Sequence, residues 1–354
     1  AWRVRSSMNA LSEQLGVTCT ASIGLMTIVY TCFDGHKTFT NSLALNNTGV
    51  NTSKLNQLER FVKNFPKEGV HMSGEQLHNR LDEIEQIRGL YTPFQLGLAA
   101  AFACSAFTFL LGGGPIEMLC AFIGAGVGNF LRCHLIKRHF TLYLCVISSV
   151  ALACLSYVLS LRLFDMIFTL PGNHEAGYIC AMLFIIPGFP FITSGIDLAK
   201  LDMRSGLERL AYAVIIVVAA TITGWIMSSI LGVHPANFAE LSIPPMLHLL
   251  FRLAASFVGV FGFSIMFNSP PAIASAAAVI GAVANTFRLE LVDLAGCPSA
   301  VAAFLGALTA GLLASFLMKR LGYPRISVTV PSIVIMVPGL YLFRAVYNMG
   351  EMSL

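Results

Sequence analysis

Two proline–glycine pairs, Pro187-Gly188 and Pro338-Gly339, interrupt apolar segments that are each long enough to cross a lipid bilayer. Proline removes a backbone donor and clashes with the preceding helical turn, so a helix should break at each pair. Inside a bilayer, the backbone groups that such a break releases are tolerated only where they face protein or a wet cavity. The half-helix after each break would offer free amides and a positive dipole end, which can bind a carboxylate. These pairs therefore predict a binding site for a small anion.

The first break lies in the stretch Pro187-Gly188-Phe189-Pro190, and hydroxyl side chains follow it on the same segment. Thr193 and Ser194 lie about one helical turn beyond the break. Each hydroxyl would either bind a polar substrate or hydrogen-bond the backbone of its own helix, and the sequence favours neither.

Asp197 has two open interpretations. If the apolar span extends through it, Asp197 is an intramembrane acid and a candidate for proton coupling. If the span ends by Ile196, Asp197 is a solvated residue that pairs with Lys200 or Arg204.

Further candidates come from two glycine-rich segments that resemble one another, IGAGVGNFLR at 123–132 and IGAVANTFR at 280–288. Asn129 and Asn285 are their matched polar residues. An asparagine inside lipid either holds helices together or lines a cavity, and a symmetric pair can do both. Arg288 is a candidate because it lies on the side of the membrane where anchoring cations are scarce. Solvation at the membrane interface is the expectation for Glu117, Asp165, Glu290 and Arg344.

The composition indicates a polytopic membrane protein. The chain has 354 residues, of which 56% are hydrophobic and 11% charged, a bias too large for an ordinary soluble domain. Its net charge of +4 fits positive loops and needs no nucleic-acid partner. The nine cysteines lie singly without CxxC spacing, so neither a disulfide framework nor a metal site is predicted, and we expect no cofactor.

Residues 1–93 hold 17 of the 40 charged residues and predict a small α+β cytoplasmic domain. Apolar spacing predicts helices over 3–16, 55–65 and 77–87, the last after a capping box at 73–76. Residues 22–33 are interpreted as one buried strand, Asp34-Gly35 as a hairpin turn and 36–45 as the returning strand. The histidines lack a nucleophile in a recognisable context, so catalysis is not expected.

Nine apolar segments follow, each near the length that crosses about 30 Å of hydrocarbon. The glycine-rich segments fall in the second and seventh spans, and the proline–glycine pairs fall in the fourth and ninth. An offset of five spans predicts that residues 94–232 and 233–354 are inverted repeats, an architecture of secondary transporters. By this symmetry a tenth helix is expected beyond Leu354. The predicted spans are 94–111, 115–132, 140–161, 175–198, 206–231, 246–267, 271–290, 298–318 and 326–347.

Basic residues predict the orientation of these spans, since cytoplasmic loops carry an excess of lysine and arginine. With residues 1–93 in the cytoplasm, nine basic residues lie on the inner side and four on the outer side. We therefore expect a multi-pass protein of the bacterial inner membrane. The inner residues are Arg132, Lys137, Arg138, Lys200, Arg204, Arg209, Lys319, Arg320 and Arg325, and the outer ones are Arg162, Arg252, Arg288 and Arg344.

With this order established, the chain resembles the threonine/serine exporter family over nearly its whole length. The resemblance is carried by Pro187-Gly188-Phe189-Pro190 with Asp197 and by Gly206-Leu207-Glu208-Arg209. The stretch Leu135-Ile136-Lys137-Arg138-His139 is similar to a split, two-subunit branch of the family that is linked to succinate export. The resemblance implies export of a small carboxylate-bearing metabolite, driven by the proton gradient, and supplies no family-wide catalytic residue.

The leading hypothesis is a proton-coupled exporter of threonine and serine, with a dicarboxylate exporter as the alternative. A dicarboxylate needs a second cation, whereas an amino acid needs an acceptor for its ammonium group. An enzyme or sensor that acts through residues 1–93 is the alternative from another class, and nine spans with an internal repeat disfavour it because an anchor needs one or two. A channel-like pore and a homo-oligomer stay open.

Overall fold

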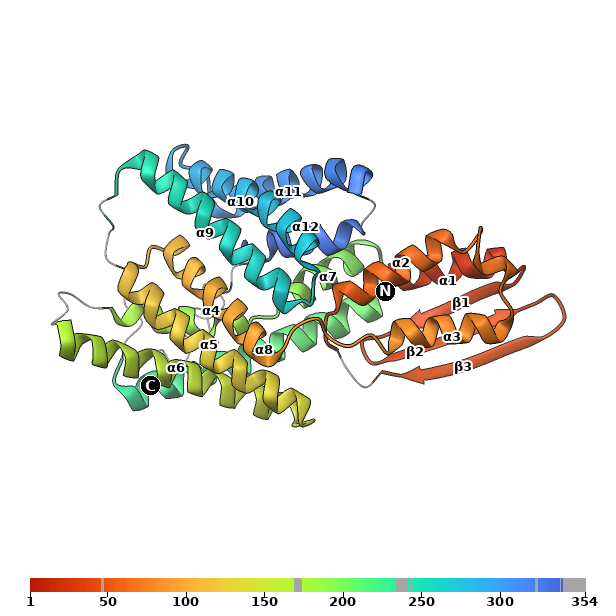
Figure 1. Ribbon diagram of the computed structural model, residues 1–354, viewed down its shortest axis with the longest axis horizontal. Coiled ribbons are helices and arrows are strands. Elements are labelled where there is room, and N and C mark those ends of the chain that lie inside the picture. Colours follow the sequence, from red (N-terminus) through yellow and green to blue (C-terminus); the bar gives the residue numbers. More distant parts are fainter. Residues whose placement is uncertain are drawn as a thin grey trace. The chain divides into compact units, whose positions relative to one another are not determined.

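The computed structural model describes residues 1–45, 48–168, 174–233, 238, 241, 243–321, 324–337 and 339. The chain forms two compact units. The head unit comprises residues 1–90 and 189–212, and the membrane unit comprises residues 91–188 and 213–354. Most of the described chain is helical, and its three strands all belong to the head unit (Figure 1).

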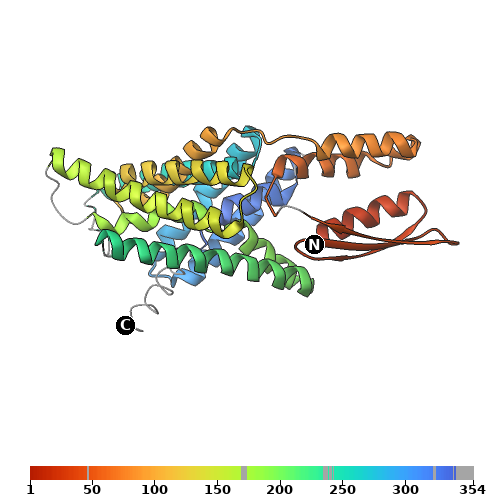
Figure 2. The same ribbon diagram turned by 90° about the horizontal axis from the view of Figure 1, so that it is seen from below.

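An antiparallel sheet with the strand order β1-β2-β3 lies in the head unit. Its strands are β1 (Thr18–Ile23), β2 (Thr27–Phe33) and β3 (Thr38–Ala44), and helix α1 (Trp2–Gln14) packs on β1 (Figure 2). The predicted hairpin turn between β2 and β3 is confirmed. The Asp34 carboxylate accepts from the backbone N–H groups of Lys37 and His36 at 2.6 and 2.8 Å, and these bonds hold the pKa of Asp34 below its usual range.

The prediction of one strand over residues 22–33 is wrong, because a tight turn divides that segment into β1 and β2. The Gly24 N–H closes the turn by donating to the Thr27 carbonyl at 2.8 Å, and the Leu25 N–H donates to Glu208 at 2.5 Å. A Cβ atom on Gly24 would lie 2.7 Å from Glu208 Oε2. Glycine therefore allows a distant carboxylate to approach the backbone here.

The helices α2 (Thr52–Asn64) and α3 (Gly74–Glu85) and the short 3-10 helix η1 (Gly69–His71) follow the sheet. The predicted capping box is confirmed, since Ser73 and Gln76 exchange hydrogen bonds of 2.9 and 3.3 Å. The head unit also contains most of α7 (Gly188–Ala199) and the beginning of α8 (Met203–Leu231).

Seven described helices are long and apolar enough to cross a membrane, and an eighth span is counted if α7 and the 3-10 helix η2 (Glu175–Ile185) form one interrupted span. All of them fall on predicted segments, so the chain is a polytopic helical membrane protein. The predicted segment 326–347 is described only through α12 (Arg325–Val334) and the residues 335–337 and 339. The seven are α8 together with α4 (Pro93–Leu110), α5 (Pro115–Lys137), α6 (Leu142–Phe168), α9 (Pro245–Met266), α10 (Pro271–Asp293) and α11 (Ser299–Leu321).

Small residues allow close helix packing in the membrane unit, as the glycine-rich segments predicted. α4 packs on α5 and α9, α5 packs on α6 and η2, and α10 packs on α9, α11 and α12. A Cβ atom on Gly128 of α5 would lie 2.8 Å from the Ser149 carbonyl of α6, and one on Gly281 of α10 would lie 3.0 Å from the Ser332 carbonyl of α12. Any larger residue at either glycine would push the helices apart.

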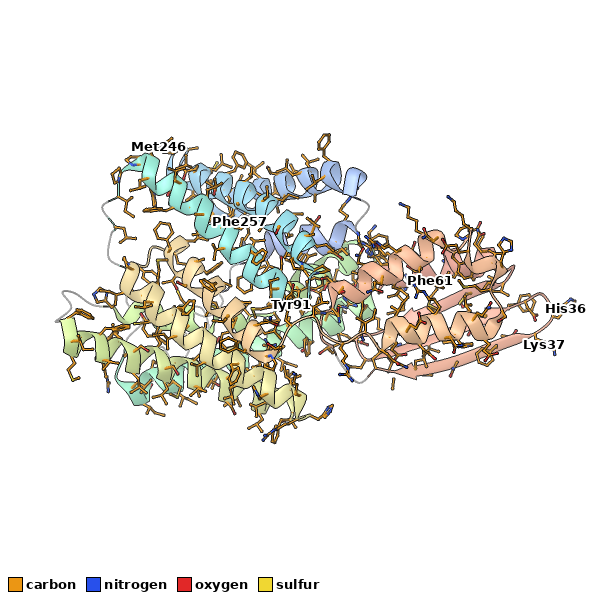
Figure 3. All side chains as sticks on the ribbon, in the orientation of Figure 1. His36, Lys37, Phe61, Tyr91, Met246 and Phe257 are labelled. Carbon is orange, nitrogen blue, oxygen red and sulfur yellow. The ribbon has the colours of Figure 1, made fainter. Side chains whose placement is uncertain are left out.

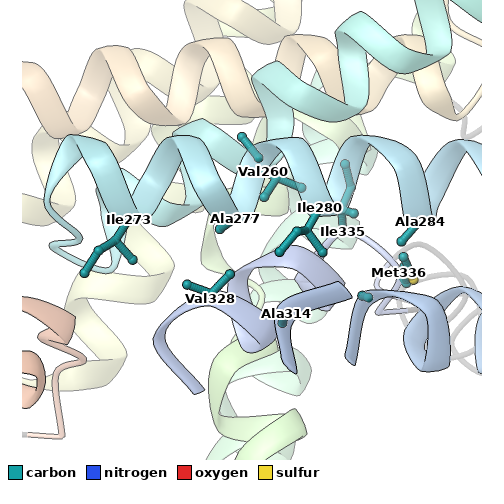
Figure 4. Close-up of a cluster of buried hydrophobic side chains, with 11 residues drawn as sticks. Val260, Ile273, Ala277, Ile280, Ala284, Ala314, Val328, Ile335 and Met336 are labelled. Carbon is teal, nitrogen blue, oxygen red and sulfur yellow. The ribbon is translucent and has the colours of Figure 1, made fainter. Parts of the chain in front are cut away.

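A cluster of buried apolar side chains joins α9, α10, α11 and α12 (Figure 4). On the outside of the helices large apolar side chains are exposed, and Met246 of α9 is 69% exposed (Figure 3). A soluble protein rarely exposes so much apolar surface, whereas a helix that faces lipid does so by default. The cluster contains Val260, Ile273, Ala277, Ala278, Ile280, Ala284, Ala310, Ala314, Val328, Ile335 and Met336.

Candidate functional site

The predicted helix break at Pro187-Gly188 is confirmed. The 3-10 helix η2 ends at Ile185, and α7 begins at Gly188. Pro187 is buried between the two helices. Of the second pair, Gly339 is described and Pro338 lies outside the described residues, so the prediction for Pro338 is not tested.

The backbone makes the same two hydrogen bonds before each of the two glycines. In each case the glycine N–H donates to the carbonyl of the residue two positions before it. The N–H of that residue donates in turn to the carbonyl three positions before its own. The first pair measures 3.2 and 2.8 Å and the second 3.1 and 2.7 Å. The donors and acceptors are Ile186 to Leu183 and Gly188 to Ile186, then Val337 to Val334 and Gly339 to Val337.

Residues of the break at Pro187-Gly188 and described residues from the end of α12 at Val334 to Gly339, called the second break below, line one small cavity in the membrane unit, with a volume of about 20 Å³. Three pairs of lining residues occupy matched positions: the two glycines, the residues two positions before them and the residues five positions before them. Phe107 of α4 and Phe263 of α9 also line the cavity. The described residues that line it have only apolar side chains, so among them only backbone groups could recognise a polar ligand. The lining residues are Phe107, Leu183, Ile186, Gly188, Phe263, Val334, Val337 and Gly339.

The two breaks touch one another through their glycines. A Cβ atom on Gly188 would lie 3.1 Å from Val334 Cγ1, and one on Gly339 would lie 2.3 Å from Ile186 Cδ1. Each glycine therefore leaves room for an apolar side chain beside the opposite break. The sequence predicted two broken segments, and the structure brings them together in the membrane unit.

Asn129 and Asn285 are both buried, and each side chain holds two helices together. Asn129 donates to the Leu96 carbonyl of α4 at 2.8 Å, and Asn285 donates to the Ser256 hydroxyl of α9 at 2.8 Å. The Asn285 Oδ1 atom has no hydrogen-bond partner among the described residues. Neither asparagine lines the cavity at the breaks, so their binding of substrate stays a prediction. The same holds for Arg288, which is half-buried on α10.

Thr193 and Ser194 hydrogen-bond their own helix, which is one of the two predicted alternatives. The Thr193 hydroxyl donates to the Phe189 carbonyl at 2.9 Å, and the Ser194 hydroxyl donates to the Phe191 carbonyl at 3.0 Å. Ser194 does not line the cavity at the breaks. Thr193 lines another cavity, which lies within the head unit and is described below.

Asp197 is 3% exposed in the head unit, and its carboxylate accepts from the Ser205 hydroxyl at 3.0 Å. The Ala1 nitrogen lies 3.0 Å from the carboxylate, and Arg209 Nε lies 3.6 Å from it. The alternative in which a solvated Asp197 pairs with Lys200 or Arg204 is wrong. Two residues at the start of α8, Ser205 and Arg209, lie beside the buried carboxylate instead.

A second cavity, of about 260 Å³, lies within the head unit. It is lined by the segment before α2, the N-terminal ends of α2 and α7, and the beginning of α8. Arg209 and the hydroxyl groups of Thr48 and Tyr212 form its polar side, and these two hydroxyls lie 3.0 Å apart. Of the predicted substrate-binding residues, Phe189, Pro190 and Thr193 line this cavity. The remaining lining residues are Leu25, Leu45, Gly49, Val50, Asn51, Thr52 and Leu55.

Two acidic residues that were expected to be solvated are paired instead. Glu117, at the beginning of α5, is 4% exposed, and its carboxyl group shares a hydrogen bond of 2.7 Å with His174 Nδ1. Glu290 lies 2.9 Å from Arg252 Nη1, and Arg252 Nη2 contacts Asp293. The sequence did not indicate these pairs, because in each pair the two partners lie on separate elements that are far apart in the chain.

Comparisons with known proteins cover most of the chain. Residues 1–231 match the family model for a threonine/serine exporter, ThrE, and residues 252–354 match a second model, described as threonine/serine exporter, ThrE. No solved structure matches the chain.

Curated relatives are distant in sequence. An uncharacterized protein of Haemophilus influenzae is 28% identical over 137 residues, which are 36% of this chain and 46% of that protein. The probable succinate transporter subunit YjjP of Klebsiella aerogenes is 24% identical over 60% of this chain and 80% of its own, and that of Escherichia coli is 23% identical over 62% and 82%. Because the first family model alone covers well over half of its residues, this chain of apolar spanning helices belongs to the threonine/serine exporter family.

Proposed function

We propose that the protein is a secondary transporter that exports small carboxylate-bearing metabolites, with threonine and serine as its first substrates. The observation that carries the proposal is that the break at Pro187-Gly188 and the segment before Gly339, which makes the same backbone hydrogen bonds, line one cavity in the membrane unit. Broken helices at corresponding places in two halves of a chain are the arrangement in which transporters bind substrate. In this proposal the protein is not an enzyme.

The proposal includes two inverted repeats, residues 94–232 and 233–354, after a cytoplasmic domain of residues 1–93. The packing partners support it. α5 packs on α4, α6 and η2, and α10 packs correspondingly on α9, α11 and α12. In the proposed orientation the chain lies in the bacterial inner membrane.

Transport by this route needs alternating access. A cavity of about 20 Å³ has room for little more than one water molecule, which needs roughly 10–15 Å³ on the same measure. Threonine and succinate are several times larger. The breaks must therefore separate to admit substrate, and we propose that the two repeats rock about them so that the cavity opens to one side at a time.

Succinate is the second candidate substrate, and the names of two relatives favour it, since both are probable succinate transporter subunits. Counterflow in proteoliposomes tests both candidates, with labelled threonine, serine and succinate under an imposed pH gradient. Threonine or serine flux without succinate flux supports the first substrate class. Robust succinate flux with no amino-acid flux rejects it in favour of the second.

Protons are the proposed coupling ion, and Asp197 is the proposed carrier. Asp197→Asn should abolish gradient-driven export while leaving substrate exchange intact, because exchange needs no net proton movement. Unchanged driven export would reject this role for Asp197. Substrate accumulation against a gradient would in turn exclude a passive pore.

A further inference from the structure

We propose that the cavity of the head unit is a binding site for a small carboxylate that carries no ammonium group, with Arg209 as its cation. The inference rests on the second candidate of the proposed function, succinate export, because it assigns the ligand class that the head unit recognises. It goes beyond the breaks in the membrane unit, where the described lining side chains carry no charge and no hydroxyl group.

The cavity has the size of a metabolite site. Its volume of about 260 Å³ is more than ten times that of the cavity at the breaks, and it lies just below the roughly 300–1,000 Å³ of pockets for drug-sized ligands. Its lining combines apolar side chains, such as those of Leu25, Leu55 and Phe189, with polar groups. A short carbon chain with a terminal carboxylate suits both kinds of lining.

Arg209 supplies the positive charge. Its Nε atom is buried beside Asp197 at 3.6 Å, which is too long for a hydrogen bond, so only the terminal Nη groups can meet a ligand in the cavity. Asp197 is fixed by the Ser205 hydroxyl at 3.0 Å, so it holds the guanidinium in place without satisfying its donors. A guanidinium with donors to spare is the group that best matches a carboxylate.

Hydroxyl groups and helix ends complete the polar side. Thr48 and Tyr212 bond one another across 3.0 Å, so their hydroxyl groups retain acceptor and donor capacity for a ligand. The N-terminal ends of α2 and α7 both line the cavity, at Thr52 and at Phe189 with Pro190. Both ends carry the positive part of a helix dipole, which favours an anion.

The lining also defines what the site rejects. Among its described residues there is no aspartate or glutamate that could accept from an ammonium group. A zwitterionic amino acid would bring its ammonium group next to Arg209 and two positive helix ends, which costs binding energy. We infer that this cavity binds succinate more tightly than threonine.

Binding of labelled succinate and labelled threonine to the purified full chain, measured by equilibrium dialysis, tests the inference. Tyr212→Phe and Thr48→Val remove one hydroxyl each and should weaken succinate binding about fivefold, the usual effect of one hydrogen bond. Arg209→Lys keeps the charge but loses the planar fork, and should weaken it at least tenfold. Arg204→Lys is the matched control. Arg204 lies on the same helix as Arg209, bonds Ser22 and Thr27 in the head unit and does not line the cavity. The control variant should therefore bind succinate as the wild type does.

The outcomes separate this inference from the proposed function. Cavity variants that bind and transport succinate like Arg204→Lys would overturn the inference while leaving the exporter proposal intact. A second outcome is that the wild type binds succinate and the cavity variants do not, while the wild type shows no counterflow. This result would support the site and overturn the exporter proposal. Tighter binding of threonine than of succinate would overturn the assigned ligand class. Tyr212→Phe is nearly isosteric, so a folding defect in Arg209→Lys would still leave the hydroxyl test decisive.

Discussion

The contact between the two breaks can be tested by adding one methyl group and removing another. A Cβ atom on Gly339 would lie 2.3 Å from Ile186 Cδ1, whereas the next atoms of Ile186 lie at 3.5 and 3.6 Å, which is ordinary van der Waals contact. Gly339→Ala should therefore overpack the site and destabilise the protein by about 1–3 kcal/mol. Ile186→Val removes only the clashing atom and should by itself cost about 0.5–1.5 kcal/mol.

The double variant Gly339→Ala/Ile186→Val should be more stable than Gly339→Ala alone, because the second change relieves the clash of the first. Thermal unfolding of the four proteins in detergent measures this coupling, and counterflow should recover in parallel. Gly311→Ala on α11 is the control, since a Cβ atom there meets nothing within 4 Å. Additive effects of the two substitutions, with no recovery in the double variant, would refute the contact between the breaks.

Three further predictions concern other parts of the chain. Cys19 and Cys32 are paired across β1 and β2 with their sulfur atoms 3.1 Å apart, and burial together with Cys32 raises the pKa of the Cys19 thiol to about 11. The fraction of Cys19 in the reactive thiolate form increases as the pH rises toward that value, so cross-linking by diamide should be at least tenfold faster at pH 9 than at pH 7. If peptide mass spectrometry showed no Cys19–Cys32 link at pH 9, the strand register would be contradicted. Asn285→Ala should cost about 1–3 kcal/mol in thermal unfolding because it leaves the buried Ser256 hydroxyl without its partner, and Ser256→Ala in the same background should add little. Glu117→Gln should shift the pH dependence of counterflow if the Glu117–His174 pair takes part in proton movement, and an unchanged pH profile would exclude the pair.

Local patterns predicted the helical elements well where the determinants lie close together in the chain. The capping box at Ser73, the turn at Asp34 and the break at Pro187-Gly188 all depend on residues a few positions apart, and all three are confirmed. The strand over 22–33 was wrong although its turn is closed locally, by the bond from the Gly24 N–H to the Thr27 carbonyl. What the local pattern did not show is that Glu208, far away in the sequence, accepts from the Leu25 N–H in this turn.

The candidate site shows the same division. The sequence by itself determined that the chain crosses a membrane many times and that Pro187-Gly188 breaks an apolar segment, since hydrophobicity and the proline ring act locally. Only the tertiary structure decided that the two glycines share one apolar cavity, that Glu117 is buried against His174 and that Arg209 lines a cavity with Thr48 and Tyr212. The physical reason is that a binding site consists of contacts between distant segments, and such contacts are set by how helices pack rather than by the periodicity of any one of them.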